Sequence, residues 1–141
     1  MLEIGTANGY STIHWSLAIP EHGKISTIEV AANAHREAVE HFSTCRIHHI
    51  FALYGDAKRI IPTLRDEYYD LVYIDAMKRE YLDYLLLSIP HLKATGWVII
   101  DDVEKFRHKM ESLYSFLERH TIPYRVEKTD LDDSIMIIDR E

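Results

Sequence analysis

Cysteine is almost absent from this chain, in which Cys45 is the only one. A lone cysteine excludes a disulfide within the chain and gives no support to a metal site built from thiolates. Such sparing use of cysteine is typical of the reducing cytoplasm, so we expect a cytoplasmic protein.

Long apolar runs are absent as well. No stretch approaches the roughly eighteen consecutive apolar residues that a transmembrane helix needs, and no signal peptide is visible. Internal repeats, low-complexity tracts and linkers are also lacking among the 141 residues. The sequence therefore predicts one domain over residues 1–141 that has no membrane partner.

Positive charge is in deficit. Lysine and arginine number 16 against 23 aspartates and glutamates, which gives a formal net charge of -7 at pH 7. This balance argues against a protein that binds nucleic acid through bulk electrostatics. One local basic cluster remains, formed by Lys105, Arg107, His108 and Lys109. It either contacts an anionic substrate or is the solvated face of an amphipathic helix.

What the chain does contain is a regular alternation of strand and helix patterns. After an opening strand we predict strands at residues 24–29, 47–53, 69–75, 96–102, 124–128 and 134–138, and helices at residues 10–19, 31–44, 57–64, 80–92 and 104–120. Repeated β–α units imply a doubly wound α/β fold with a parallel sheet, right-handed crossovers and helices on both faces. The last two strands, joined by the acidic turn 130–133, can form a hairpin.

The opening stretch, residues 1–11, runs from a short apolar strand through a glycine turn into a helix. Gly5 and Gly9 let the backbone turn sharply and approach a ligand closely, and the first N–H groups of the helix point at it. This arrangement suits a nucleotide-type ligand at the carboxyl end of a strand. An ordinary strand-to-helix turn explains the stretch equally well.

Acidic residues lie at the ends of most predicted strands. They are Glu3, Glu29, Asp75, Asp101 and Asp102, with Asp56 in the loop after the third strand. Carboxylates that gather on one sheet edge repel one another, so the pattern favours cations or hydroxyl-rich ligands there. Helix N-caps account for one or two of these acids.

The spacing of the turn distinguishes between cofactors. Glu29 follows Gly9 by about twenty residues, where a doubly wound fold places an acid on a ribose diol. A dinucleotide fingerprint would read G-x-G-x-x-G, whereas the glycines here are Gly5-x-x-x-Gly9. Glu3 would also repel a pyrophosphate. A cofactor with an amino group, a sulfonium cation and no phosphate fits better, and S-adenosylmethionine has these features.

These residues resemble a known family. Residues 2–11 look like the cofactor motif of class I methyltransferases, and the Gly-Tyr-Ser ending is the form found in cation-dependent O-methyltransferases of the catechol and caffeoyl-coenzyme A group. Glu29 is similar to the ribose-binding acid of that family, and residues 55–57 to its adenine-contacting loop. Residues 73–81 resemble its metal and catalytic motif, D-x-x-K followed by a tyrosine.

The resemblance implies a Rossmann-like sheet of seven strands with the last antiparallel, and transfer of a methyl group from S-adenosylmethionine to a hydroxyl of a small-molecule acceptor. The cofactor-binding residues that it implies are Glu3, Gly5, Thr6, Ala7, Gly9, Tyr10, Ser11, Glu29, Asp56, Ala57 and Asp75. Family habit favours a homodimer.

Catalytic roles follow from the same motif. Asp75 would bind a divalent cation, with Mg²⁺ expected because it is a hard ion that prefers oxygen ligands. The ion would acidify a substrate hydroxyl, and Lys78 would act near that hydroxyl as general base or as electrostatic partner of the oxyanion. Alternatively, Lys78 is a solvated lysine at the start of the next helix.

The chain departs from the family pattern in two places. The family usually has Asp-Asn after the fifth strand, and alignment on Gly96 places Asp102-Val103 there. Valine cannot ligate a metal. Related sugar and macrolide O-methyltransferases carry two adjacent acids at this position, so the resemblance implies Asp75, Asp101 and Asp102 as the ligands, and a variant without metal is the alternative. The usual N-terminal helices do not precede the first strand. We expect either a fragment or a pocket that is open or completed by a partner subunit.

Two other functions stay open. One is an O-methyltransferase that acts on a hydroxylated uridine of tRNA, and the other is a degenerate cofactor-binding module without catalysis. Histidine metal sites are not expected. His48 and His49 would point to opposite faces of a strand, and the spacing of His35 and His41 on a helix does not suit one shared ion.

Overall fold

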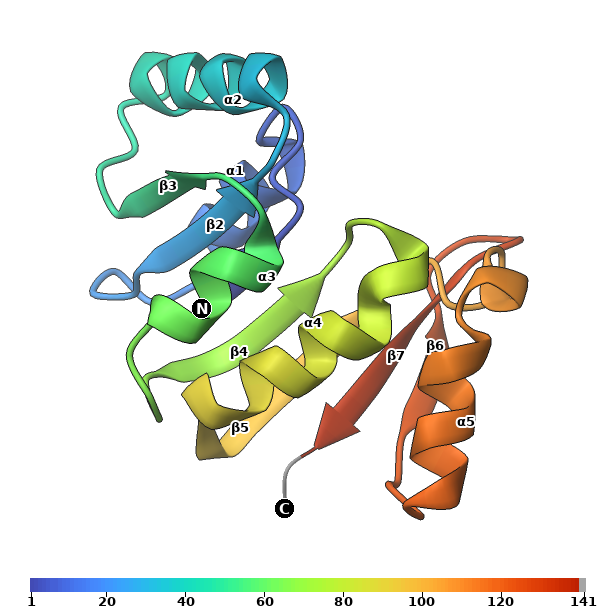
Figure 1. Ribbon diagram of the computed structural model, residues 1–141. Helices are drawn as coiled ribbons and strands as arrows, with labels where there is room; N and C mark the ends of the chain where they lie inside the picture. The colour runs from blue at the N-terminus through green and yellow to red at the C-terminus, as the bar shows by residue number, and fades with distance from the viewer. Residues whose placement is uncertain (140–141) are drawn as a thin grey trace.

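Residues 1–139 of the computed structural model build a seven-stranded sheet with helices around it (Figure 1). The strands are β1 (Leu2–Ile4), β2 (Ile25–Glu29), β3 (Ile50–Tyr54), β4 (Tyr69–Ile74), β5 (Leu92–Ile100), β6 (Arg125–Lys128) and β7 (Ser134–Asp139). Their spatial order is β3-β2-β1-β4-β5-β7-β6. Strands β1 to β5 run parallel, and β7 is antiparallel to both β5 and β6. The predicted fold class is confirmed.

The helices are α1 (Tyr10–Ala18), α2 (Ala32–Thr44), α3 (Ala57–Ile60), α4 (Tyr81–Ser88) and α5 (Glu111–Arg119). Right-handed crossovers place α1 and α2 on one face of the sheet and α3, α4 and α5 on the other. Helix α4 packs against both α3 and α5 in front of the sheet (Figure 1). No helix in the described part of the chain has the length and apolar character that a membrane span needs.

Strand β1 shows why the sheet sits at the centre. All three of its residues are buried, and it pairs with β2 on one side and β4 on the other. Strand β4 is likewise buried along most of its length, as a strand covered on both faces should be. The chain reverses its direction of winding between β1 and β4, and ligands of doubly wound sheets bind at such a point.

The predicted helix 80–92 begins one residue before α4 and extends too far at its C-terminal end. The 3₁₀ turn η2 (Lys78–Glu80) precedes α4, and α4 gives way at Ser88 to a second 3₁₀ turn, η3 (Ile89–His91). Pro90 lies in η3, and because proline has no N–H it cannot continue an α-helix. Strand β5 then begins directly at Leu92.

The predicted helix 104–120 is also too long, since α5 starts only at Glu111. The residues before it form turns and the 3₁₀ turn η4 (Arg107–Lys109). They are held there by Val103, whose N–H binds the Ser134 carbonyl and whose carbonyl accepts a hydrogen bond from the Tyr114 hydroxyl. The basic cluster therefore does not lie on the face of an amphipathic helix.

The third strand begins later than predicted. The Ile47 N–H binds the Phe42 carbonyl, and Arg46 has a φ of +55°, so the chain is still completing the end of α2 at that point. Strand β3 starts at Ile50, and His48 and His49 precede it. The prediction that these histidines lie within a strand is wrong.

Candidate active site

A cleft of about 490 Å³ lies at the carboxyl ends of the parallel strands. The ends of β1 and β2 provide its centre, and the segments after β3 and β4 provide its two sides. Its lining residues are Ile4, Gly5, Ala7, Ile28, Glu29, Val30, Asp56, Ala57, Lys58, Asp75, Ala76, Met77, Glu80 and Tyr84. The predicted strand-end acids Glu29, Asp56 and Asp75 thus share one cavity.

The turn after β1 forms the tightest part of this cleft. Gly5 has a φ of +101°, and a Cβ added to it would lie 1.9 Å from the carbonyl oxygen of Asp75. Ala7 and Gly9 also have left-handed backbones, with φ of +48° and +86°. A Cβ on Gly9 would lie 2.6 Å from the Phe42 ring. The two glycines are therefore required by backbone conformation and by close packing.

Glu3 lies beneath this turn and is fully buried. Its Oε1 accepts a hydrogen bond of 2.7 Å from the Ser11 hydroxyl. Its Oε2 accepts from Thr27 at 2.6 Å and from the Thr12 hydroxyl. Thr6 in turn shares a hydrogen bond of 2.6 Å with Thr27. The hydroxyls satisfy the buried carboxylate, which ties β1, β2 and the start of α1 together under the turn.

Burial raises the pKa of Glu3 above its ordinary value of 4.5, although the hydrogen bonds from Thr12, Thr27 and Ser11 oppose the shift. Native Glu3 therefore keeps its proton in a pH range where the unfolded chain has released it. As pH rises from about 4.5 through the raised pKa, this group makes the free energy of unfolding fall.

Glu3→Gln tests this linkage. Near pH 4.5 the variant should be about 1–2 kcal/mol less stable than the wild type, because the amide nitrogen cannot accept a hydroxyl hydrogen bond as either oxygen of the carboxyl group can. The deficit should shrink as pH rises, because only the wild type loses stability. Urea unfolding at several pH values measures it, with Glu37→Gln on the exposed side of α2 as the control for net charge. A deficit that grew with pH would contradict the raised pKa.

Two further acids line the cleft with partly engaged carboxylates. Glu29 Oε2 accepts from the Ala7 N–H and Oε1 from the Ala31 N–H, both at 2.8 Å. Asp56 caps α3, since its Oδ1 accepts from the Lys58 N–H at 2.9 Å. A carboxylate offers about four lone-pair positions, so both side chains retain capacity for ligand hydroxyl or amino groups.

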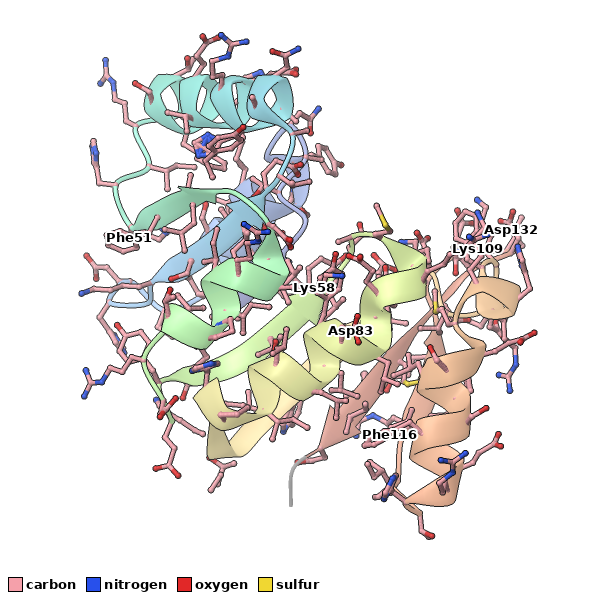
Figure 2. The ribbon with its side chains drawn as sticks, in the orientation of Figure 1. Phe51, Lys58, Asp83, Lys109, Phe116 and Asp132 are labelled. Carbon is pink, nitrogen blue, oxygen red and sulfur yellow. The ribbon has the colours of Figure 1, made fainter. Side chains whose placement is uncertain are left out.

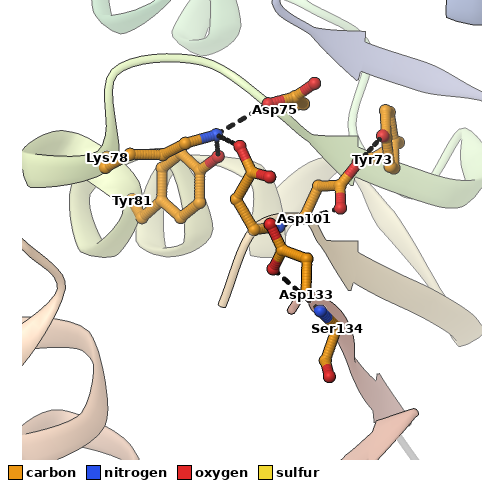
Figure 3. Close-up of polar contacts among 8 residues, drawn as sticks. Tyr73, Asp75, Lys78, Tyr81, Asp101, Asp133 and Ser134 are labelled. Atoms are coloured by element: carbon orange, nitrogen blue, oxygen red, sulfur yellow. Dashed lines mark hydrogen bonds and ion pairs between the residues drawn. The ribbon is translucent and has the colours of Figure 1, made fainter. Parts of the chain in front are cut away.

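Lys78 lies beside the cleft, at the centre of a polar cluster (Figure 3). Its Nζ is 2.8 Å from Asp75 Oδ1, 2.5 Å from Asp102 Oδ2 and 2.6 Å from the hydroxyl of the buried Tyr81. These contacts use all three donors of the ammonium group. The ring of Phe106 lies 5.7 Å from the same nitrogen. Lys78 is therefore fixed in place and is not a freely solvated lysine.

Protonation of this cluster follows from its contacts. Burial by itself would lower the pKa of Lys78, but the hydrogen bonds to Asp102, Asp75 and Tyr81 outweigh it and raise the pKa. Burial would likewise raise the pKa of Asp102, but the hydrogen bond from Lys78 holds that pKa below its ordinary value. The cluster thus contains a persistent ammonium group.

Asp101 and Val103 differ from their neighbour Asp102. The Asp101 carboxylate accepts from the Tyr73 hydroxyl and, at 2.8 Å, from the Asp102 N–H. Val103 is fully buried in the core. Asp102 has a φ of +59°, a left-handed conformation in which Asp and Asn are enriched among residues other than glycine. Among residues 1–139, no three His, Cys, Asp or Glu side chains form a group suited to a metal ion.

The turn between β6 and β7 also reaches the cluster (Figure 3). Asp133 accepts from the Ser134 N–H at 2.8 Å, and burial together with the neighbouring Asp102 raises the pKa of Asp133. Sequence analysis did not single out this residue. The acidic composition of the turn was visible, but its distance from Asp102 depends on how β7 pairs with β5.

The cleft contains part of the predicted cofactor set. Gly5, Ala7, Glu29, Asp56, Ala57 and Asp75 line it. The remaining predicted residues lie elsewhere: Glu3, Thr6 and Ser11 form the network beneath the turn, Gly9 packs on α2, and the exposed Tyr10 ring lies 4.4 Å from the ring of His14. Lining residues that the sequence did not reveal include Lys58, Met77, Glu80 and Tyr84.

Known proteins match this chain in sequence. A family model described as O-methyltransferase matches residues 1–112. The catechol O-methyltransferase of Niastella koreensis is 32% identical over 109 residues, which are 72% of this chain and 48% of that protein. The tapetum-specific methyltransferase 1 of Arabidopsis thaliana is 29% identical over 105 residues, 72% of this chain and 45% of that protein. The chain spans about half the length of the curated relatives it matches.

Solved structures match the fold. The O-methyltransferase TomG from Streptomyces achromogenes, involved in tomaymycin synthesis and solved with S-adenosylmethionine, gives a TM-score of 0.83 at 22% identity, over 99% of this chain and 72% of that chain. The methyltransferase PaMTH1 of Podospora anserina, solved with S-adenosylhomocysteine, gives 0.84 at 20% identity, over 99% and 71%. At these identities the likeness concerns the fold alone.

Proposed function

Because the chain belongs to the O-methyltransferase family, we propose that it transfers a methyl group from S-adenosylmethionine to a hydroxyl of a small-molecule acceptor. The observation that carries this proposal is the position of Asp75. Asp75 lines the cleft, and its Oδ1 binds Lys78 at 2.8 Å. Asp75 thus connects the proposed cofactor cleft to Lys78. Among the described residues, Lys78 is the only lysine whose ammonium contacts two of the strand-end acids, Asp75 and Asp102.

The reaction needs a nucleophilic oxygen on the acceptor. This oxygen attacks the methyl carbon, the bond from that carbon to sulfur breaks, and S-adenosylhomocysteine leaves as a neutral thioether. Lys78 is an ammonium in the structure because its pKa is raised. Of the two roles considered, general base and electrostatic partner, the second is therefore favoured. The ammonium stabilises the acceptor as an oxyanion, whose proton passes to water.

A divalent cation is compatible with part of the predicted ligand set. Asp75 and Asp102 converge on one cation, the Lys78 ammonium, whereas the Asp101 oxygens face Tyr73 and the Asp102 N–H. Mg²⁺ is commonly held by one or two carboxylates together with waters, so we propose Asp75 and Asp102 as its protein ligands. A bound ion would acidify the acceptor hydroxyl.

Calorimetry and an acceptor assay test the proposed function. Titration with S-adenosylmethionine should give one site per chain, and a catechol should be methylated on oxygen at a rate that Mg²⁺ increases. The catechol is chosen because one matched relative carries that name. If neither S-adenosylmethionine nor S-adenosylhomocysteine bound, the proposal would be overturned. If turnover were unaffected by Mg²⁺ and by a chelator, only the proposed role of the cation would be withdrawn.

A further inference from the structure

An ion pair joins the two sides of the cleft. Lys58, on the first turn of α3, comes after β3, whereas Glu80, in η2, comes after β4. Strands β2 and β1 lie between β3 and β4 in the sheet, and their ends form the centre of the cleft. Lys58 Nζ and Glu80 Oε1 are nevertheless 2.6 Å apart. Figure 2 shows Lys58 extending from α3 toward α4, where Asp83 also lies.

The pair is anchored at its acidic end. Glu80 Oε2 accepts a hydrogen bond of 2.6 Å from the hydroxyl of the buried Tyr84, so each carboxylate oxygen has its own donor. Asp83 Oδ2 lies 3.9 Å from the Lys58 ammonium and adds a second negative charge. The hydrogen bond with Glu80 raises the pKa of Lys58, and the same contact together with Tyr84 lowers the pKa of Glu80. Both groups are therefore charged at neutral pH.

The anchored pair lies at one particular end of the cleft. Lys58, Glu80 and Tyr84 all line it, and the Lys58 N–H also binds Asp56, the acid expected to contact adenine. The reacting end, marked by Lys78, is defined by other contacts, to Asp75, Asp102 and Tyr81. Under the proposed function, an ion pair in this position would border the nucleoside and lie apart from the acceptor oxygen bound by Lys78.

We propose that Lys58, Glu80 and Tyr84 form a clasp that retains the nucleoside part of the cofactor and of its product, and thereby sets the rate at which S-adenosylhomocysteine leaves. The inference rests on the proposed function, since it assigns the cleft to an adenosine cofactor. The three are positioning residues.

The clasp should respond to salt in a way that a packing contact would not. The Lys58 and Glu80 side chains are 36% and 26% exposed, so dissolved ions can screen their attraction. Dissociation of S-adenosylhomocysteine from the wild type should therefore become faster as ionic strength rises. A variant that lacks the ion pair should lose this dependence.

The test measures the dissociation of radiolabelled S-adenosylhomocysteine from the full chain, chased with unlabelled ligand. Glu80→Gln and Lys58→Met should each raise the dissociation rate about three- to fivefold, as the loss of one partly exposed pair supports. The double variant should be no faster than either single variant, because both remove the same contact. Tyr84→Phe should act in the same direction but less strongly.

Two controls sharpen the result. Lys93→Met breaks an ion pair of 2.7 Å with Asp70, which borders a different cavity, and should leave dissociation unchanged. Glu37→Gln, which removes an exposed carboxylate on α2 as Glu80→Gln removes one beside the cleft, should likewise leave dissociation unchanged. Unchanged dissociation in Glu80→Gln and Lys58→Met, or fully additive effects in the double variant, would overturn the clasp. Failure of the wild type to bind S-adenosylhomocysteine would instead overturn the proposed function.

Discussion

Lys78→Met is expected to lower the rate constant for methyl transfer about a hundredfold or more, while the affinity for S-adenosylmethionine stays within about twofold. Methionine keeps an unbranched side chain of nearly the same length and removes its charge. The acceptor oxyanion would then face Asp75 and Asp102 without the ammonium that now binds both. Two carboxylates beside a developing negative charge oppose the reaction. Cofactor affinity should survive, because Lys78 does not line the cleft.

Single-turnover kinetics and calorimetry together measure this effect. Lys109→Met is the matched control. The Lys109 and Lys78 ammonium groups lie 4.9 Å and 5.7 Å from the same Phe106 ring, but the contacts with Asp75 and Asp102 belong to Lys78. The control should react at the wild-type rate. A fully active Lys78→Met would contradict the assignment of the reacting end of the cleft.

The second large effect is expected at the turn after β1. Gly5→Ala should destabilise the chain by about 3–5 kcal/mol and abolish cofactor binding. The new methyl group would lie 1.9 Å from the Asp75 carbonyl oxygen, on a backbone whose φ of +101° already disfavours any side chain. Since backbone cannot rotate away as a side chain can, the end of β4 must shift, and Asp75 must move with it.

Gly55→Ala separates the two causes. Gly55 also has a positive φ, of +143°, but its added Cβ would meet only the end of the Ile60 side chain, at 3.1 Å. It therefore shares the conformational penalty without the collision with backbone. Urea unfolding of both variants, with S-adenosylhomocysteine titrated into each, gives the comparison. Equal losses of stability would show that the collision at Gly5 is relieved.

The sequence predicted the sheet because its strands are short apolar runs that end in acids. Glu29, Asp56 and Asp75 follow such runs, and parallel strands bring their ends to one edge, so these residues share the cleft. Errors arose where a neighbour far along the chain decides the local structure. The backbone of Val103 is hydrogen-bonded to Ser134 and Tyr114. These contacts hold the segment after β5 outside a helix, so α5 begins only at Glu111.

The same limit explains the residues that were missed or misplaced. Glu3 looked like a ligand-facing acid, yet its partners Ser11, Thr12 and Thr27 cover it completely, and only the pairing of β1 with β2 brings Thr27 there. Lys58 and Glu80 are separated by 22 positions and lie on segments with no shared pattern. Periodicity identifies which face of an element is buried, but it does not identify which polar side chains meet.

The Glu29 carboxylate has a consequence for how a ligand is received. Its two oxygens hold the N–H groups of Ala7 and Ala31, so the left-handed turn after β1 is fixed by the chain's own side chain. The entropy of ordering this loop is lost once, during folding, and not at every encounter with a ligand. Under the proposed function, a cofactor exchanged at each turnover would meet a loop that is already held in place, and its affinity would not be reduced by a search for the competent loop conformation.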